Sequence, residues 1–153
     1  MAKSGRHHDG NRLTHLGVCV SELERSLAFY CGALGFVELD RLSVADDESA
    51  RLLGVDGLDV ELVYIERDGV RIELLWYRQP GHRGDATPRP MNLVGLTHFA
   101  FRVGDFDDLC RRIETAGGQV LVGTAAVFAR GNRGIMALDP DGTRVELIER
   151  PGE

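Results

Sequence analysis

Hydrophobic positions follow a strand pattern and then a helix pattern, and this order occurs twice along the chain. In the first half the strand pattern covers four stretches, at about 13–20, 36–43, 59–67 and 70–77. Between the first two, apolar residues recur at helical spacing, at Leu23, Leu27, Tyr30 and Leu34. Gly35 predicts the end of that helix, and Ser21 with Glu24 predicts a capping box at its start.

The second half shows the same succession. A helix is predicted from Phe106, Leu109, Cys110 and Ile113, with Asp105 as its N-cap and Gly117-Gly118 at its end. The strand pattern lies at about 96–103, 119–122, 126–129, 134–138 and 143–149. Each half therefore predicts a strand, a helix and then further strands.

Short sequence matches link the two halves. L-T-H-L-G-V-C-V begins at Leu13 and L-T-H-F-A-F-R-V begins at Leu96, while D-G-V-R-I-E-L-L begins at Asp68 and D-G-T-R-V-E-L-I begins at Asp141. The Asp-Gly pairs predict tight turns. We expect an α+β fold in which two paired βαβββ modules form one domain over 12–150. The expected parts are a flexible tail at 1–11, module one at 12–77, a linker at 78–92 and module two at 93–150.

One histidine and one glutamate recur on the strands of each half. Because side chains alternate along a strand, His15 and Glu73 are expected on the face away from the helix, and so are His98 and Glu146. If the two sheets curve toward each other, two imidazoles and two carboxylates converge. Such a set suits one divalent metal, Zn, Ni, Co, Mn or Fe. A single strand histidine is more often structural, and duplication alone can preserve the pattern.

Composition narrows the classes of partner. The net charge of −6 argues against non-specific nucleic-acid binding, which needs a basic face. No apolar run is long enough for a membrane span, and the polar N-terminus does not look like a secretory signal, so a cytoplasmic protein is expected. The three cysteines include no C-x-x-C pair, which gives no indication of a thiolate zinc site or a disulfide framework.

These motifs resemble the vicinal oxygen chelate superfamily, which includes glyoxalase I, methylmalonyl-CoA epimerase, extradiol dioxygenases, and fosfomycin and bleomycin resistance proteins. The resemblance rests on the two L-T-H segments, F-Y-C-G-A-L-G-F and D-P-D-G-T-R-V-E-L-I-E, and covers about 13 to 150. It implies a U-shaped open barrel around a metal held by His15, Glu73, His98 and Glu146. It also implies a small-molecule substrate and a homodimer.

The resemblance further implies a metal-dependent lyase or isomerase of the glyoxalase I or epimerase type. In that chemistry a proton moves through a metal-bound enediolate or enolate of a small oxygen-chelating substrate, with Glu146 or Glu73 as the base. The alternatives are an Fe(II) extradiol-type dioxygenase, a thiol transferase for antibiotic resistance and a non-catalytic small-molecule binding protein. The four metal-competent residues favour the first reading over sequestration.

Arginines supply the candidate substrate contacts. Arg130, Asn132 and Arg133 lie in A-R-G-N-R-G, where guanidinium groups are suited to a substrate carboxylate or phosphate. Arg102 shares the strand face of His98 and is a fourth candidate. The alternative for the A-R-G-N-R-G segment is an exposed arginine-rich hairpin.

Overall fold

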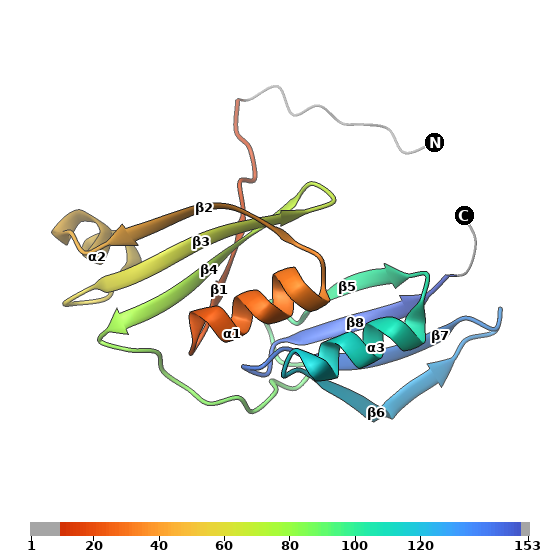
Figure 1. Ribbon diagram of the computed structural model, residues 1–153. Helices are drawn as coiled ribbons and strands as arrows, with labels where there is room; N and C mark the ends of the chain where they lie inside the picture. The colour runs from red at the N-terminus through yellow and green to blue at the C-terminus, as the bar shows by residue number, and fades with distance from the viewer. Residues whose placement is uncertain (1–9, 151–153) are drawn as a thin grey trace.

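Two four-stranded sheets make up the fold, one from each half of the chain (Figure 1). The computed structural model describes residues 10–150. The first half contains β1 (Leu16–Cys19), α1 (Leu23–Leu27), the π-helix η1 (Ala28–Ala33), β2 (Val37–Val44), α2 (Asp47–Leu53), β3 (Asp59–Arg67) and β4 (Val70–Gln79). The second half contains β5 (His98–Val103), α3 (Phe106–Thr115), β6 (Gln119–Val127), β7 (Arg133–Leu138) and β8 (Arg144–Glu149). The α+β class and the repeated βαβββ order are therefore confirmed.

Both sheets have the same topology. The strand order is β1-β4-β3-β2 in the first and β5-β8-β7-β6 in the second. The opening strand of each half runs parallel to the closing strand, and the other neighbours are antiparallel. His15 directly precedes the edge strand β1, and His98 is the first residue of the edge strand β5. In each half the neighbouring strand carries the glutamate.

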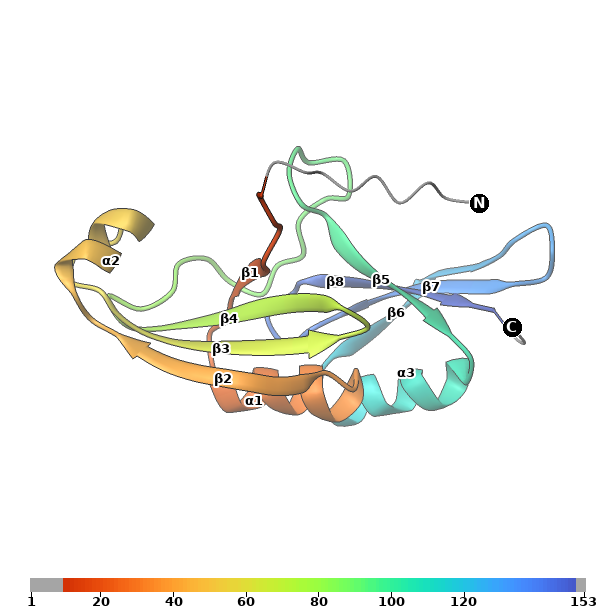
Figure 2. The same cartoon turned by 90° about the horizontal axis from the view of Figure 1, so that it is seen from above.

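Helices α1 and α3 form one layer along one side of both sheets, while the short helix α2 lies apart at the end of the first sheet (Figure 2). The main buried core extends from one half to the other and includes Phe29 and Ile72 from the first half together with Ile113 and Leu147 from the second. The ring of Phe36 meets that of Phe101 edge to face, with the centroids 6.2 Å apart. Burial of apolar surface is the main stabilising contribution to folding, so the two halves stabilise each other.

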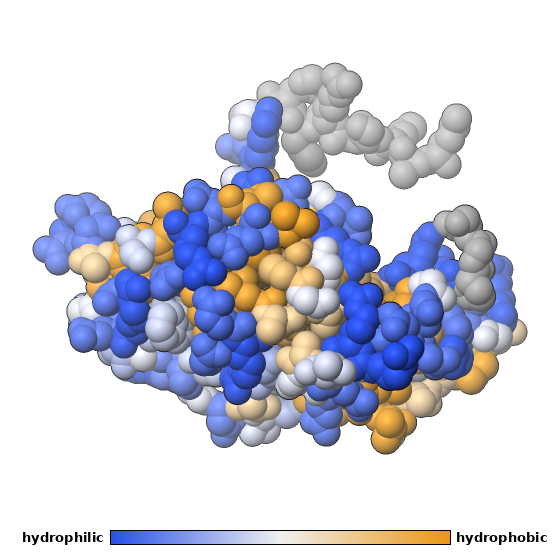
Figure 3. Space-filling view, in the orientation of Figure 1, coloured by the Kyte–Doolittle hydropathy of each residue, from blue (hydrophilic) through white to orange (hydrophobic). Residues whose placement is uncertain are grey.

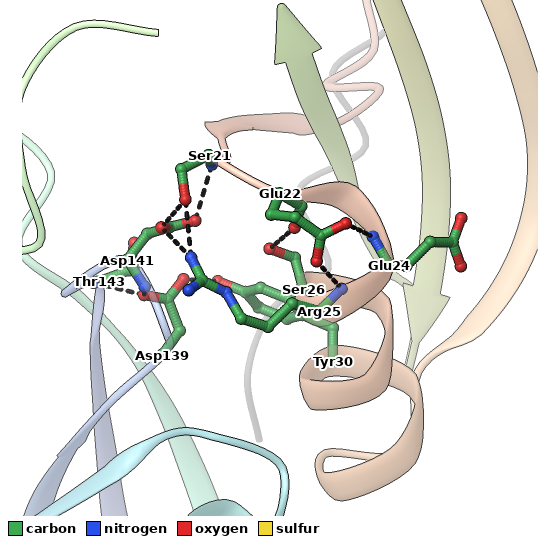
Figure 4. A network of polar contacts seen from close by, with 9 residues as sticks. All are labelled: Ser21, Glu22, Glu24, Arg25, Ser26, Tyr30, Asp139, Asp141 and Thr143. Carbon is green, nitrogen blue, oxygen red and sulfur yellow. Dashed lines mark hydrogen bonds and ion pairs between the residues drawn. The ribbon is translucent and has the colours of Figure 1, made fainter.

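A polar junction joins the turn between β7 and β8 to the start of α1 (Figure 4). The buried Tyr30 hydroxyl donates to Asp139 Oδ2 at 2.8 Å. The Ser21 N–H donates to Asp141 Oδ2 at 2.9 Å, and Arg25 forms an ion pair with Asp141 at 2.8 Å. Burial raises the pKa of Asp139 and, with the neighbouring Asp139 carboxylate, the pKa of Tyr30.

Two local predictions are wrong, and one helix was missed. The predicted capping box is wrong, because Glu22 caps α1 while Ser21 binds Asp141. The two strands predicted at 119–122 and 126–129 are one strand, β6, which ends at Val127 and has a register shift between Leu121 and Ala126. Helix α2 was not predicted.

Other local predictions hold. Asp105 caps α3, since its side chain accepts a hydrogen bond from the Asp108 N–H. Asp68 and Gly69 take φ values of 52° and 77° in the two-residue turn between β3 and β4.

Strand β4 runs to Gln79, slightly beyond the expected end of module one. Of the expected tail, only residues 10 and 11 lie within the described part of the chain.

Exposed apolar residues gather at the outer strands. Val37 and Leu39 in β2 are 63% and 48% exposed, and Val122 and Val127 in β6 are 77% and 73% exposed. Figure 3 shows patches of apolar surface between charged side chains on the face that it views. Within residues 10–150, no helix has the length and hydropathy needed to cross a membrane.

Candidate metal centre

The first half brings His15 and Glu73 together, as the alternation of strand residues predicted. Glu73 lies opposite Gly17 in the parallel β1–β4 pair, so His15 projects from the same face. His15 Nε2 is 3.4 Å from Glu73 Oε2. The Glu73 side chain is 12% exposed and that of His15 is 33% exposed, so the pair is reachable at the sheet surface.

The second half repeats this arrangement with His98 and Glu146. Glu146 lies opposite Ala100 in the parallel β5–β8 pair, which places it on the face of His98. His98 Nε2 is 3.1 Å from Glu146 Oε2, and the two side chains are 28% and 30% exposed. The small residues Gly17 and Ala100 stand beside the two carboxylates and leave room in front of them.

A threonine orients each histidine ring. The Thr14 hydroxyl oxygen lies 2.9 Å from His15 Nδ1, and the Thr97 hydroxyl oxygen lies 2.8 Å from His98 Nδ1. When Nδ1 carries the proton and donates to the threonine, Nε2 keeps the lone pair that a metal ligand needs. Nε2 of each ring faces a carboxylate oxygen, and that of His98 is within hydrogen-bond distance of Glu146 Oε2, so a bound metal would take the place of a proton on this nitrogen.

The donor set and its spacing fit a divalent metal. Imidazole nitrogen and carboxylate oxygen are ligands for Zn and its neighbours in the first transition row. Two ligand atoms that each lie about 2.1 Å from one ion at right angles are about 3 Å apart. The spacings of 3.4 Å and 3.1 Å within the pairs agree with this value. Each pair therefore fits as half of a metal site.

One chain does not bring the two pairs together. Among residues 10–150 there is no group of three or more histidine, cysteine, aspartate or glutamate side chains close enough to hold a metal. A cavity of about 430 Å³ opens between β1 and β5, and of the four candidate ligands only His98 lines it. The expected convergence of four residues is thus seen as two separate half-sites.

The half-sites differ in one contact. The Tyr64 hydroxyl donates a 2.6 Å hydrogen bond to Glu73 Oε1, and the ring of Tyr64 meets that of His15 edge to face at 5.4 Å. The hydrogen bond to Glu73 raises the pKa of Tyr64 to about 12. In the second half, Met136 stands opposite Glu146.

Arg133 does not lie near either half-site carboxylate. Its guanidinium pairs with Glu149 at 2.7 Å and Asp107 at 3.0 Å, and lies 4.6 Å from the centre of the Phe106 ring. Arg133 falls on the helix face of β7, opposite to the face of Glu146, because Met136 is the β7 residue that pairs with Glu146. These contacts give no support to the prediction that Arg133 contacts substrate, and that prediction stays untested.

The other three predicted substrate contacts lie in two different places. Arg130 is exposed and Asn132 half-buried in the turn between β6 and β7, and the Asn132 carbonyl accepts a hydrogen bond from the Phe128 N–H. Arg102 lies opposite Ile148, on the face that carries His98 and Glu146. Of the four, Arg102 best keeps its predicted place beside a half-site.

The sequence analysis missed the residues that contact the candidate ligands. Thr14 and Thr97 were detectable, because T-H occurs in both halves at matching positions. The contact of Tyr64 could be predicted only from the register of β3 and β4, which the two-residue turn at Asp68 sets and which pairs Tyr64 with Glu73.

Comparison with known proteins relates the chain to one large group. Residues 12–147 match the model of the Glyoxalase/Bleomycin resistance protein/Dioxygenase superfamily. The lactoylglutathione lyase of Salmonella typhimurium is 32% identical over 141 residues, which cover 90% of this chain and 92% of that enzyme.

Solved structures show the same fold. A glyoxalase family protein from Bacillus cereus superposes with a TM-score of 0.79 at 21% identity, covering 94% of this chain and 99% of that chain. The trypanothione-dependent glyoxalase I of Leishmania major gives a TM-score of 0.63 at 20% identity, covering 91% and 86%. The fosfomycin resistance protein FosX of Listeria monocytogenes gives 0.61 at 19% identity, covering 92% and 93%.

Proposed function

Because the chain belongs to the Glyoxalase/Bleomycin resistance protein/Dioxygenase superfamily, we propose that it is a metal-dependent lyase or isomerase that moves a proton within a small oxygen-chelating substrate. The observation that carries this proposal is the repeated His–Glu pair, with Nε2 to Oε2 distances of 3.4 Å and 3.1 Å. The lactoylglutathione lyase relative supports a lyase, and makes a hemithioacetal of glutathione the first substrate to test.

His15, Glu73, His98 and Glu146 would hold the metal. The chemistry that a bound divalent ion supplies there is Lewis-acid polarisation of two neighbouring substrate oxygens. The chain itself would move the proton: a carboxylate oxygen of Glu146 or Glu73 takes it from the carbon beside a substrate carbonyl. That carboxylate returns the proton to the adjacent carbon in a glyoxalase-type reaction, or to the same carbon in an epimerisation. Arg102, on the same face, would contact an anionic part of the substrate.

A second copy of the chain would complete each site. Structural and catalytic metal sites usually have three or four protein ligands, and each half-site offers two. Strands β1 and β5 are both edge strands, so each half-site lies at a border of its sheet. A two-fold dimer would set the first half-site of one copy against the second half-site of the other and form two equal sites.

Metal analysis is the first test. We expect the purified protein to contain about one divalent ion per chain, to lose activity after chelation and to regain it on addition of metal. Glu146→Gln and Glu73→Gln serve as site variants, and Arg51→Ala in the exposed helix α2 serves as a surface control. Absence of bound metal together with full activity in the presence of chelator would reject the proposal.

The reaction class is tested by following the proton. Incubation in deuterium oxide with the hemithioacetal of methylglyoxal and glutathione, or with a 2-methyl-branched acyl thioester, should yield product or recovered substrate labelled at the carbon that exchanges. An Fe(II) dioxygenase would instead consume oxygen, and a thiol transferase would consume thiol. A protein that only binds its ligand would show none of these.

A further inference from the structure

The two carboxylates of the proposed metal site are held differently, although the halves of the chain repeat. Tyr64 stands opposite Glu73 in the β3–β4 pair, and Met136 stands opposite Glu146 in the matching β7–β8 pair. The duplication has thus kept histidine and glutamate at both sites while the neighbouring position differs. A tyrosine hydroxyl can donate a hydrogen bond to a carboxylate, and a methionine thioether has no proton to donate.

We propose that Tyr64 is a positioning residue that fixes Glu73 as the carboxylate that stays on the metal and leaves Glu146 to carry the substrate proton. This inference rests on the proposed function and decides between the two carboxylates that it leaves open. No role in binding substrate is assigned to Tyr64.

The contacts of Tyr64 explain how it would fix Glu73. Its hydroxyl donates to Glu73 Oε1 at 2.6 Å, while the other oxygen, Oε2, lies 3.4 Å from His15 Nε2. One carboxylate oxygen is therefore tied to the sheet and the other is directed toward the histidine. The Tyr64 ring packs edge to face on His15, so one side chain restrains both ligands of this half-site.

The difference in burial between the two carboxylates also favours Glu73 as the one that stays in place. The Glu73 side chain is 12% exposed, against 30% for Glu146. Met136 beside Glu146 is flexible and offers no hydroxyl, so it places fewer restraints on that carboxylate. A carboxylate that transfers protons has to change its hydrogen-bond partners during turnover, which favours the less restrained of the two.

Tyr64→Phe tests the inference because it removes the hydroxyl and keeps the ring against His15. Metal affinity is measured on the metal-free protein by titration with Zn²⁺ and with Co²⁺, without substrate. Loss of such a supporting hydrogen bond typically weakens metal binding roughly 10- to 100-fold. We expect a loss of this size, with the proton-exchange rate at saturating metal close to that of the wild type.

Two comparisons make the result specific. Tyr77→Phe removes another hydroxyl from the same face of β4, where the described part of the chain shows no hydrogen-bond partner for it, and should leave metal affinity unchanged. In a double-mutant cycle, Tyr64→Phe should weaken binding in the wild type and add little in a Glu73→Gln background, because the two changes remove the same interaction. Glu146→Gln should retain more metal affinity than Glu73→Gln and lose proton exchange.

Several outcomes would overturn the inference while leaving the proposed function intact. One is a wild-type protein that binds metal and exchanges protons, with unchanged affinity in Tyr64→Phe. Another is full affinity in Tyr64→Phe with proton exchange lost, which would make the hydroxyl a participant in proton transfer. Proton exchange that survives in Glu146→Gln and disappears in Glu73→Gln would reverse the assignment. A wild-type protein that binds no metal would instead reject the proposed function itself.

Discussion

Subunit complementation tests whether the proposed site is built from two chains. Glu73→Gln damages only the first half-site of a chain, and Glu146→Gln damages only the second. Each variant alone should be inactive, because every site in its homodimer contains the damaged half. A heterodimer of the two variants behaves differently, since the halves are drawn from different copies.

The expected recovery follows from the geometry of the half-sites. In the heterodimer, one site combines the intact first half of the Glu146→Gln chain with the intact second half of the Glu73→Gln chain. The other site combines both damaged halves. Pure heterodimer should therefore have about half of the wild-type activity per dimer, and a randomly assorted mixture about one quarter.

Co-expression provides the assay. The two variants carry different affinity tags, and purification through both tags isolates heterodimers for measurement of proton exchange and metal content. Heterodimers should bind one tightly held metal ion per dimer, in proportion to the recovered activity. Heterodimers of wild-type chains that carry the same tags provide the reference.

Heterodimers without activity would contradict the two-chain site. If all four ligands belonged to one chain, each chain in the heterodimer would still contain a damaged site, and no activity would return. Inactive heterodimers that remain folded and dimeric would refute the two-chain site. A monomer in solution with full metal content would refute it as well.

Three further predictions concern the framework around the site. Gly118→Ala should lower the free energy of unfolding by about 1–3 kcal/mol, because an added Cβ would lie 2.5 Å from a ring carbon of Phe29; Gly104→Ala, where nothing lies within 4 Å, is its control in the same thermal melts. Burial raises the pKa of the Asp139 carboxyl, so the folded chain binds this proton more tightly than the unfolded chain. The free energy of unfolding should therefore fall as the pH rises above about 3.9, the pKa of this group in the unfolded chain. Asp139→Asn should flatten this part of the plot of melting temperature against pH. Arg133→Ala should lower the melting temperature and leave kcat/KM unchanged, because Arg133 lies on the helix face.

Each of these has a result that contradicts it. Equal melting temperatures for Gly118→Ala and Gly104→Ala would show that the junction between the halves accommodates the extra carbon. Parallel pH profiles for Asp139→Asn and the wild type would mean that other carboxylates set the acid response. A clear fall in kcat/KM for Arg133→Ala would return that guanidinium to the substrate site.

Strand alternation was enough to predict the half-sites, and it was not enough to predict how they meet. The pairing of His15 with Glu73 depends on a two-residue period and on neighbouring strands, both of which repeat in His98 and Glu146. The relation between the two pairs depends on how the sheets sit on one another. That relation is set by core contacts between distant segments, such as Phe36 against Phe101, which local patterns do not encode.

Two misplaced residues show the same limit at smaller scale. Ser21 has the right position for a helix cap, but Asp141, far away in the sequence, binds its backbone N–H. Arg133 was taken as part of a loop, whereas β7 begins at Arg133 itself. Once a residue belongs to a strand, the register of that strand decides which face of the sheet its side chain is on. A shift of one position moves the side chain from the helix face to the opposite face.

The shared helix layer has a consequence for the origin of this chain. Phe29 and Ile113 belong to different halves and meet in one core, so a polypeptide of a single βαβββ unit would leave that apolar surface bare. Such an ancestor would have needed a second molecule against its helices. Fusion of two gene copies would then have turned that contact into an internal one and freed the open faces to evolve apart, as the exchange of Tyr64 for Met136 illustrates.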